Sequence, residues 1–162
     1  MNLNTNFDAC ISFASPVGDI SLFAREGKIV ALHMGAPAAP AIGSSPVLEQ
    51  AKAQLQQYFA GDLQDFDLPL DPHGTEFQKA VWAQIAKIGF GKTITYQEIA
   101  AKLGKPLASR AVGGAVGSNP IALLIGCHRV LGAAGRITGY SGGDGIPTKR
   151  WLLAHEQIAT VD

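Results

Sequence analysis

The spacing of apolar residues changes character between residues 34 and 75, and this change limits most strongly what the chain can fold into. From Cys10 to Met34, short runs alternate apolar and polar residues, and the turn-forming segments PVGD and REGK separate them. From Thr75 onward, apolar residues instead recur every three or four positions, as on one face of a helix. The pattern predicts an α/β fold in which a small antiparallel sheet precedes a mainly helical part.

A loop, one helix and an acidic crossing segment separate these two parts. Residues 35–45 are rich in Gly, Pro and small side chains, which favour a loop or linker. Ser45 can cap a helix that has Pro46 at its first position, and Gly61 can end this helix. The apolar face of the helix is expected to cover one face of the sheet. The segment DLQDFDLPLDPHG, with two prolines, is predicted to cross between the halves. We therefore expect domains over residues 1–73 and 74–162.

Three helical segments are expected in the second part. Thr75 with Gln78, and Thr95 with Glu98, have the spacing of a capping box, which satisfies two free backbone N–H groups at a helix start. The third segment is LASRAVGGAVGS. The last two helices are short and joined by a turn that contains Gly104, an arrangement typical of a helix-turn-helix, although generic helical hairpins share it.

Charge is segregated along the chain although the formal net charge is zero. Residues 1–73 hold eight acidic and three basic residues, a net charge of −5, whereas residues 74–162 hold five and ten, a net charge of +5. Lys102, Lys105 and Arg110 lie around the helix-turn-helix. A nucleic acid would be attracted to the second half and repelled by the first. Chance segregation on a solvated surface is the alternative.

The third helical segment contains Gly113, Gly114 and Gly117. Each glycine costs a helix about 1 kcal/mol relative to alanine, so the sequence gives up helix stability for a surface with almost no side chains. Two explanations stay open: tight packing of this helix against the core, or close approach of a nucleic-acid backbone or groove.

Composition excludes several classes of protein. With 162 residues and 47% apolar composition the chain can bury an ordinary core, and no apolar run has the length of a membrane span. The stretch MNLNTNFDAC has no features of an export signal, so we expect a cytoplasmic protein without a membrane partner. Cys10 and Cys127 lie far apart, and His33, His73 and His155 are isolated. We expect free thiols, no metal and no cofactor.

The stretch IGCHRV places a thiol beside a histidine. A thiol is a nucleophile only as the thiolate, and its ordinary pKa is about 8.5, so it needs a base or a positive field nearby. His128 can be that base if the chain bends after Cys127, because neighbouring residues of a strand face opposite sides. The preceding letters SNP and IALLI predict a turn and a buried run that ends at Cys127. If this stretch is taken alone, an inert buried cysteine is the commoner explanation. A papain-like peptidase is a further alternative, but the sequence before Cys127 lacks the local signature of that family.

Several linked motifs resemble the O6-alkylguanine-DNA alkyltransferases, also called methylated-DNA–protein-cysteine methyltransferases. They are SNPIALLIGCHRVLGAAGRITGYSGG, WLLAHE, TYQEIAAKLG and SRAVGGAVGSNP, and they cover about residues 74–156 in order. The first half resembles the family only in layout, which implies a small ribonuclease H-like domain. The resemblance implies repair of double-stranded DNA by direct transfer of a methyl or larger alkyl group from O6 of guanine to the protein, once per molecule.

The resemblance also implies roles for five residues in the chemistry. Cys127 would accept the alkyl group as a stable thioether. His128 would take the thiol proton through a water, and Glu156 would orient the histidine. Asn119 would tie the turn that joins the helix-turn-helix to the active-site strand, and Tyr96 would donate a proton toward guanine N3.

Further residues are implied in binding the base and the DNA. Tyr140 and Ser141 would form the wall and a hydrogen-bonding contact of the base pocket, and the Val130 carbonyl would accept from the exocyclic amine. The alkylated base would be flipped out of the duplex, and Arg110 would fill the space left behind while its helix lies in the minor groove. The remaining implied DNA contacts are Gln97, Lys105, Ala111 and Gly114. We expect a monomer, with cooperative binding along DNA left open.

The sequence departs from the family pattern in four places. Gly126 and Gly89 stand where the family usually has proline, which loosens the backbone. The loop after Ser141 is about two residues longer than usual, and Ala122 replaces a proline of some relatives. A non-enzymatic protein that binds alkylated bases with the same fold is therefore the alternative, although Cys127 disfavours it. A dimeric transcription factor ranks third, since no dimer element is visible.

Overall fold

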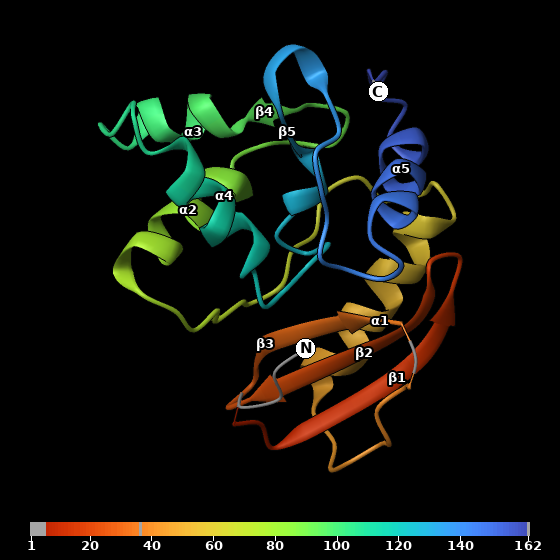
Figure 1. The fold of residues 1–162 in the computed structure, drawn as a ribbon. Coiled ribbons are helices and arrows are strands. Elements are labelled where there is room, and N and C mark those ends of the chain that lie inside the picture. Colours follow the sequence, from red (N-terminus) through yellow and green to blue (C-terminus); the bar gives the residue numbers. More distant parts are fainter. Residues whose placement is uncertain (1–5, 36, 162) are drawn as a thin grey trace.

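The computed structural model describes residues 6–35 and 37–161 and begins with a three-stranded antiparallel sheet (Figure 1). Its strands are β1 (Ala9–Ser15), β2 (Gly18–Arg25) and β3 (Lys28–Met34), paired in the order β1-β2-β3. Glu26 and Gly27 between β2 and β3 have φ of 51° and 77°, as in hairpin turns that follow the strand twist. The predicted meander is confirmed. Residues 1–5, half of the stretch tested for an export signal, lie outside the described residues.

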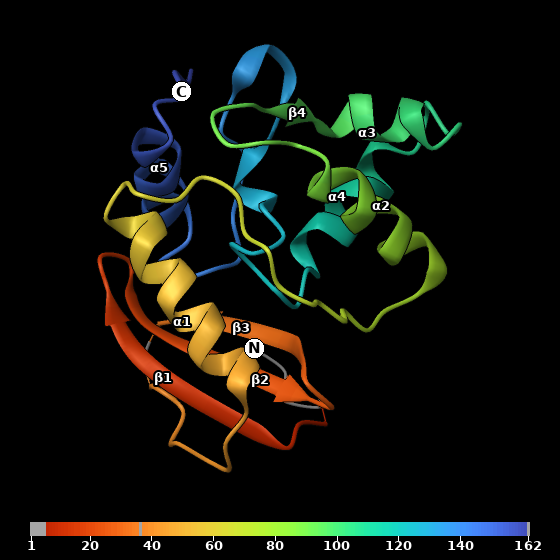
Figure 2. The ribbon, with the colours of Figure 1, turned by 180° about the vertical axis from the view of Figure 1, so that it is seen from behind.

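Helix α1 (Pro46–Phe59) lies across one face of the sheet (Figure 2), as predicted. Ser45 holds the extended N-cap position, but its hydroxyl makes no capping hydrogen bond, so that part of the prediction is wrong. Pro46, whose ring fixes φ near the helical value, starts the helix. Gly61, with φ of 84°, follows its end. The helix buries Val47, Leu48, Ala51, Leu55 and Tyr58.

The acidic crossing segment is held against the edge of the sheet. The Ile29 amide of β3 donates to the Pro69 carbonyl at 2.9 Å, and the Asp71 amide donates to the Ile29 carbonyl at 2.8 Å. Leu70 between them forms a parallel bridge with Ile29. The crossing therefore extends the hydrogen bonding of β3 before the chain enters the helical half.

The second half contains helices α2 (Glu76–Ala86), α3 (Tyr96–Lys102), α4 (Ser109–Gly117) and α5 (Ile146–His155). Both predicted capping boxes are present, at the starts of α2 and α3. The two-residue strands β4 (Ile94–Thr95) and β5 (Val130–Leu131) pair in parallel. This pairing brings the start of α3 next to the segment that follows Cys127.

The apolar core is continuous across the predicted boundary near residue 73. Leu22 and Leu48 of the first half belong to the same buried cluster as Val81, Ile99 and Leu152 of the second half. The carboxyl end of α1 meets α5 (Figures 1 and 2), where Tyr58 and Phe59 contact His155. Within residues 6–35 and 37–161, no helix combines the length and the apolar character needed to cross a membrane.

Candidate active site

A pocket of about 610 Å³ opens between α3, α4 and the loop that precedes α5. Helix α4 contributes Arg110 and otherwise small side chains to the pocket wall, and Cys127 lines the pocket although the residue is buried. The structure thus gathers around one pocket five of the residues that the resemblance implies in chemistry, base binding or DNA binding. They are Cys127, Tyr96, Tyr140, Ser141 and Arg110.

A folded-back turn, and not a strand, delivers Cys127 to the pocket. The Asn119 side chain accepts from the Ile121 amide at 3.0 Å and donates to the Ile125 carbonyl at 2.8 Å, so it closes this turn. Leu123 has φ of 73°, which a regular strand does not contain. The expectation of an active-site strand here is therefore wrong, although the run is buried as predicted.

The chain bends at Cys127, as a role for its neighbour requires. Residues Cys127–Arg129 form a short 3₁₀ turn that starts after Gly126. Gly126 has φ of −71°, within the range that proline would impose, so the backbone keeps a proline-like path at this position. The turn points His128 and Arg129 toward one acceptor, the carboxylate of Glu156.

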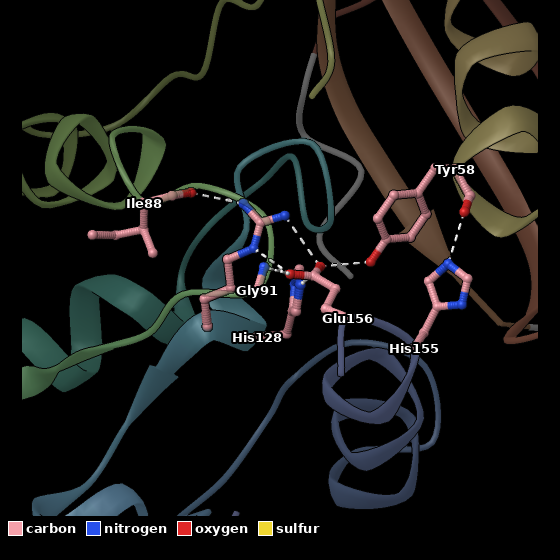
Figure 3. A network of polar contacts seen from close by, with 7 residues as sticks. Tyr58, Ile88, Gly91, His128, His155 and Glu156 are labelled. Carbon is pink, nitrogen blue, oxygen red and sulfur yellow. Dashed lines mark hydrogen bonds and ion pairs between the residues drawn. The ribbon is translucent and has the colours of Figure 1, made fainter. Parts of the chain in front are cut away.

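Glu156, which follows α5, receives hydrogen bonds from several elements (Figure 3). His128 Nε2 lies 2.6 Å from its Oε2, and Arg129 donates through Nε to Oε1 at 2.8 Å and through Nη2 to Oε2 at 3.1 Å. The Gly91 amide donates to Oε1 at 3.2 Å, and the Tyr58 hydroxyl is 2.6 Å from Oε2. The carboxylate is fully surrounded by donors, which suits a buried charge.

The protonation of this group follows from its surroundings. Burial raises the pKa of Glu156, but hydrogen bonds from His128 and Arg129 outweigh burial and hold the pKa well below its ordinary value. An ionised carboxylate only accepts, so His128 Nε2 carries the ring proton and Nδ1 carries the lone pair. Nδ1 is buried and has no hydrogen-bond partner among the described residues. It is the nitrogen that can take up a proton.

The thiol and the imidazole are both neutral at rest. Burial lowers the pKa of His128, and the hydrogen bond that His128 donates to Glu156 offsets this only in part. Burial also raises the pKa of Cys127. The Asn119 amide and the Lys149 charge lower this pKa, but burial outweighs them. A thiolate therefore forms only when the proton moves to a base, and it does not persist in the free protein.

Lys149 of α5 is buried beside the pocket and was given no role from the sequence. Its ammonium donates to the carbonyls of Val130 at 2.7 Å and Gly139 at 3.0 Å, so it joins the segment after Cys127 to the pocket loop. Burial lowers its pKa to about 8, so the group is largely charged at neutral pH. Val130 is fully buried and is not among the residues that line the pocket.

The hydroxyl groups of Tyr96, Thr138 and Ser141 at the pocket are hydrogen-bonded to neighbouring residues. Thr138 Oγ1 donates to the Tyr96 hydroxyl at 3.2 Å, which leaves the Tyr96 proton free to be donated elsewhere. Ser141 donates to the Gly117 carbonyl of α4 at 3.1 Å. The Tyr140 hydroxyl is buried without a hydrogen-bond partner among the described residues.

The helix-turn-helix presents a smooth outer surface next to the pocket. An added Cβ at Gly114 or Gly117 would meet no atom within 4 Å, and at Gly113 it would only touch the Tyr96 ring at 3.9 Å. Packing against the core therefore does not explain these glycines, which favours the other explanation, an approaching ligand. The residues associated with DNA contact are all exposed here: Gln97, Lys105, Arg110, Ala111 and Gly114.

Three residues of the site carry no signal in the sequence. Tyr58 lies 98 positions from Glu156, Lys149 lies 19 positions from Val130, and Arg129 reaches back 41 positions to the Ile88 carbonyl. No fixed spacing links such pairs, so only the folded chain identifies them. No group of three or more His, Cys, Asp or Glu in the described part of the chain could hold a metal ion.

Both halves of the chain match domains of the same group of known enzymes. Residues 76–158 match the family profile described as 6-O-methylguanine DNA methyltransferase, DNA binding domain, and residues 9–72 match the ribonuclease-like domain of the same enzymes. A methylated-DNA--protein-cysteine methyltransferase of Methanosarcina acetivorans is 44% identical, over 89% of this chain and 95% of the relative.

Solved structures show the same similarity. The crystal structure of Mycobacterium tuberculosis O6-methylguanine methyltransferase has a TM-score of 0.80 and 41% identity, covering 93% of this chain and 94% of that one. The crystal structure of the Mycobacterium tuberculosis protein OGT in complex with DNA has a TM-score of 0.82 and 40% identity, covering 91% and 92%.

Proposed function

The chain belongs to the 6-O-methylguanine DNA methyltransferase family, and on that premise we propose that Cys127 accepts an alkyl group from O6 of guanine in double-stranded DNA. The protein repairs DNA by alkyl transfer to a cysteine. The single observation that carries the assignment to Cys127 is its position at the pocket, directly before a histidine held by a buried carboxylate.

The transfer is a displacement at the alkyl carbon. The Cys127 sulfur forms a bond to this carbon while the carbon–oxygen bond to guanine breaks. The thiol proton passes through a water to His128 Nδ1, and Glu156 stabilises the imidazolium that forms. The product is a thioether, which is a poor leaving group, so each molecule acts once.

The leaving guanine takes up a proton as the carbon–oxygen bond breaks. Tyr96 is the donor toward N3, because Thr138 already donates to its oxygen and leaves the phenol proton available. Protonation neutralises the negative charge that would otherwise develop on the purine, which lowers the barrier to displacement. Tyr140 and Ser141 line the space for the base.

The alkyl group of a duplex guanine can reach Cys127 only if the base leaves the stack, which costs a few kcal/mol. The glycine-bearing surface of α4 permits close approach to the minor groove, and Arg110 at the mouth of the pocket fills the gap in the duplex. We propose a monomer as the acting unit, because Cys127, the pocket around it and the His128–Glu156 pair are already assembled within a single copy of the chain. The need for a reduced thiol suits a cytoplasmic location.

Intact-protein mass tests the proposal. After incubation with a duplex that carries one O6-methylguanine, we expect the protein to gain the mass of one CH2 group. Cys127→Ser should gain nothing. Cys10→Ser is the matched control, since Cys10 is the other cysteine and is buried in the sheet with its thiol donating to the Pro40 carbonyl at 2.9 Å. This variant should still gain the full mass.

Two results would overturn the assignment. A gain in Cys127→Ser that is absent in Cys10→Ser would move the acceptor to Cys10. No gain in the wild type, combined with preferential binding of the alkylated duplex, would identify a protein that binds the damage without transferring the group.

A further inference from the structure

Tyr58 is a residue of the amino-terminal half that reaches the catalytic carboxylate. It lies near the end of α1, is fully buried, and packs against Phe59, Phe66 and Phe90. Its hydroxyl is 2.6 Å from Glu156 Oε2, and its backbone carbonyl accepts from His155 Nε2 at 2.7 Å (Figure 3). The side chain and the backbone of one residue therefore connect α1 to the end of α5.

We propose that Tyr58 is a positioning residue for alkyl transfer: its hydroxyl donates to the Glu156 oxygen that also holds His128, and thereby fixes the carboxylate and limits its attraction for the imidazole proton. The proposal rests on the proposed function, because it assumes that His128 is the base. It also gives the amino-terminal half a part in the chemistry.

The hydroxyl can act in this way because it is a neutral donor at every working pH. Burial, followed by the hydrogen bond to Glu156, raises the pKa of Tyr58 well above its ordinary value. The phenol therefore keeps its proton and shares the charge of Oε2 with His128 Nε2. A carboxylate that loses a donor becomes more basic toward the donors that remain.

The sign of the effect on His128 follows from the groups that face it. Glu156 raises the pKa of His128, whereas burial and the charges of Arg129 and Lys149 lower it, and the neighbouring Cys127 thiol is uncharged at rest. If the Tyr58 hydroxyl is removed, the full charge of Oε2 acts on the imidazole, and the pKa of His128 rises. A protonated His128 cannot accept the thiol proton, so transfer fails at a higher pH than in the wild type.

Tyr58→Phe tests the proposal, because it removes one oxygen and keeps the ring among its aromatic neighbours. We would measure the single-turnover transfer rate from an O6-methylguanine duplex between about pH 4 and pH 9, a range that extends below the ordinary pKa of histidine because burial lowers the pKa of His128. We expect the midpoint of the acid limb to rise by up to about one pH unit, with up to about a tenfold loss of rate below it. Near the alkaline end, the two proteins should have similar rates.

Two further variants separate tuning from a structural effect. Phe66→Leu perturbs the same aromatic cluster without removing a polar group, and it should leave the midpoint unchanged. In a Glu156→Gln background, Tyr58→Phe should cause no further shift, because the charge that the hydroxyl moderates is absent. Nitrogen-15 NMR of labelled histidines, with the His128 signal assigned by a His128→Asn variant, should report the same rise in the pKa of His128.

The outcomes are distinguishable from failure of the proposed function. If the wild type transfers the methyl group and Tyr58→Phe has an unchanged midpoint and NMR titration, the tuning role is refuted while the repair function stands. An equal loss of rate at every pH would reduce Tyr58 to a packing residue. If the wild type transfers nothing, the proposed function fails first.

Discussion

At the scale of single residues, the site depends on a bend that no periodic pattern predicts. His128 and Arg129 are neighbours in sequence, yet both bind Glu156 because the 3₁₀ turn brings their side chains to the same side. The motifs predicted that Cys127 and its histidine lie together only if the chain bends there. They could not predict Tyr58, because its hydroxyl meets the carboxylate only after α1 docks against α5.

Arg110→Ala should slow repair in duplex DNA more than it slows attack on the free base. Arg110 is exposed at the mouth of the pocket and holds no catalytic group in place, so its loss leaves Cys127 and His128 unchanged. If Arg110 fills the gap in the duplex, as proposed above, its side chain offsets part of the few kcal/mol needed for base flipping. We expect about a tenfold or larger loss of rate with an O6-methylguanine duplex and little change with free O6-methylguanine. Equal losses for both substrates would exclude a role in flipping.

At the scale of secondary-structure elements, local chemistry decided which predictions succeeded. The capping boxes at Thr75 and Thr95 fix helix starts through bonds within four residues, so sequence alone identified α2 and α3. The run IALLI has the composition of a strand, but the Asn119 side chain and the left-handed Leu123 fold it into a turn. The burial of this run was predictable from composition. Its path was not, because it depends on a hydrogen bond between Asn119 and Ile125, which are six positions apart.

Helix α4 offers a test of whether its glycines serve DNA binding. Gly114 is exposed, and an added Cβ there would meet no protein atom, so Gly114→Ala should stabilise the helix by about 0.5–1 kcal/mol. The melting temperature should rise by about 1–4 °C, while the affinity for duplex DNA falls because the methyl group separates the helix from the groove. Calorimetry and fluorescence anisotropy measure the two effects.

The matched control for this variant is Gly89→Ala. Gly89 also has open space around it and lies away from the left-handed region, so the variant should gain stability without losing DNA affinity. If Gly114→Ala leaves the affinity for duplex DNA unchanged, DNA binding does not explain the glycines of α4.

At the scale of the whole molecule, the charge pattern follows the fold, so that the two halves of the chain differ in charge as well as in structure. The acidic half forms the sheet and α1, and the basic half carries the helix-turn-helix and the pocket. The sequence predicted this division because charge and periodicity change together near residue 73. It could not predict that both halves share one core, since that depends on which faces meet.

The orientation of DNA on this surface can be tested through the salt dependence of binding. Lys105 is exposed in the turn between α3 and α4, where a phosphate would release one counterion on contact. Lys105→Gln should weaken duplex binding and make the plot of log affinity against log salt shallower by about 0.9. Lys28→Gln removes an equal charge at the start of β3, in the acidic half, and should leave the slope unchanged. If both variants change the slope equally, binding responds to overall charge and the helix-turn-helix does not define the contact. If only Lys105→Gln changes it, the phosphate backbone lies along the turn that leads into α4, the helix that lines the pocket of Cys127.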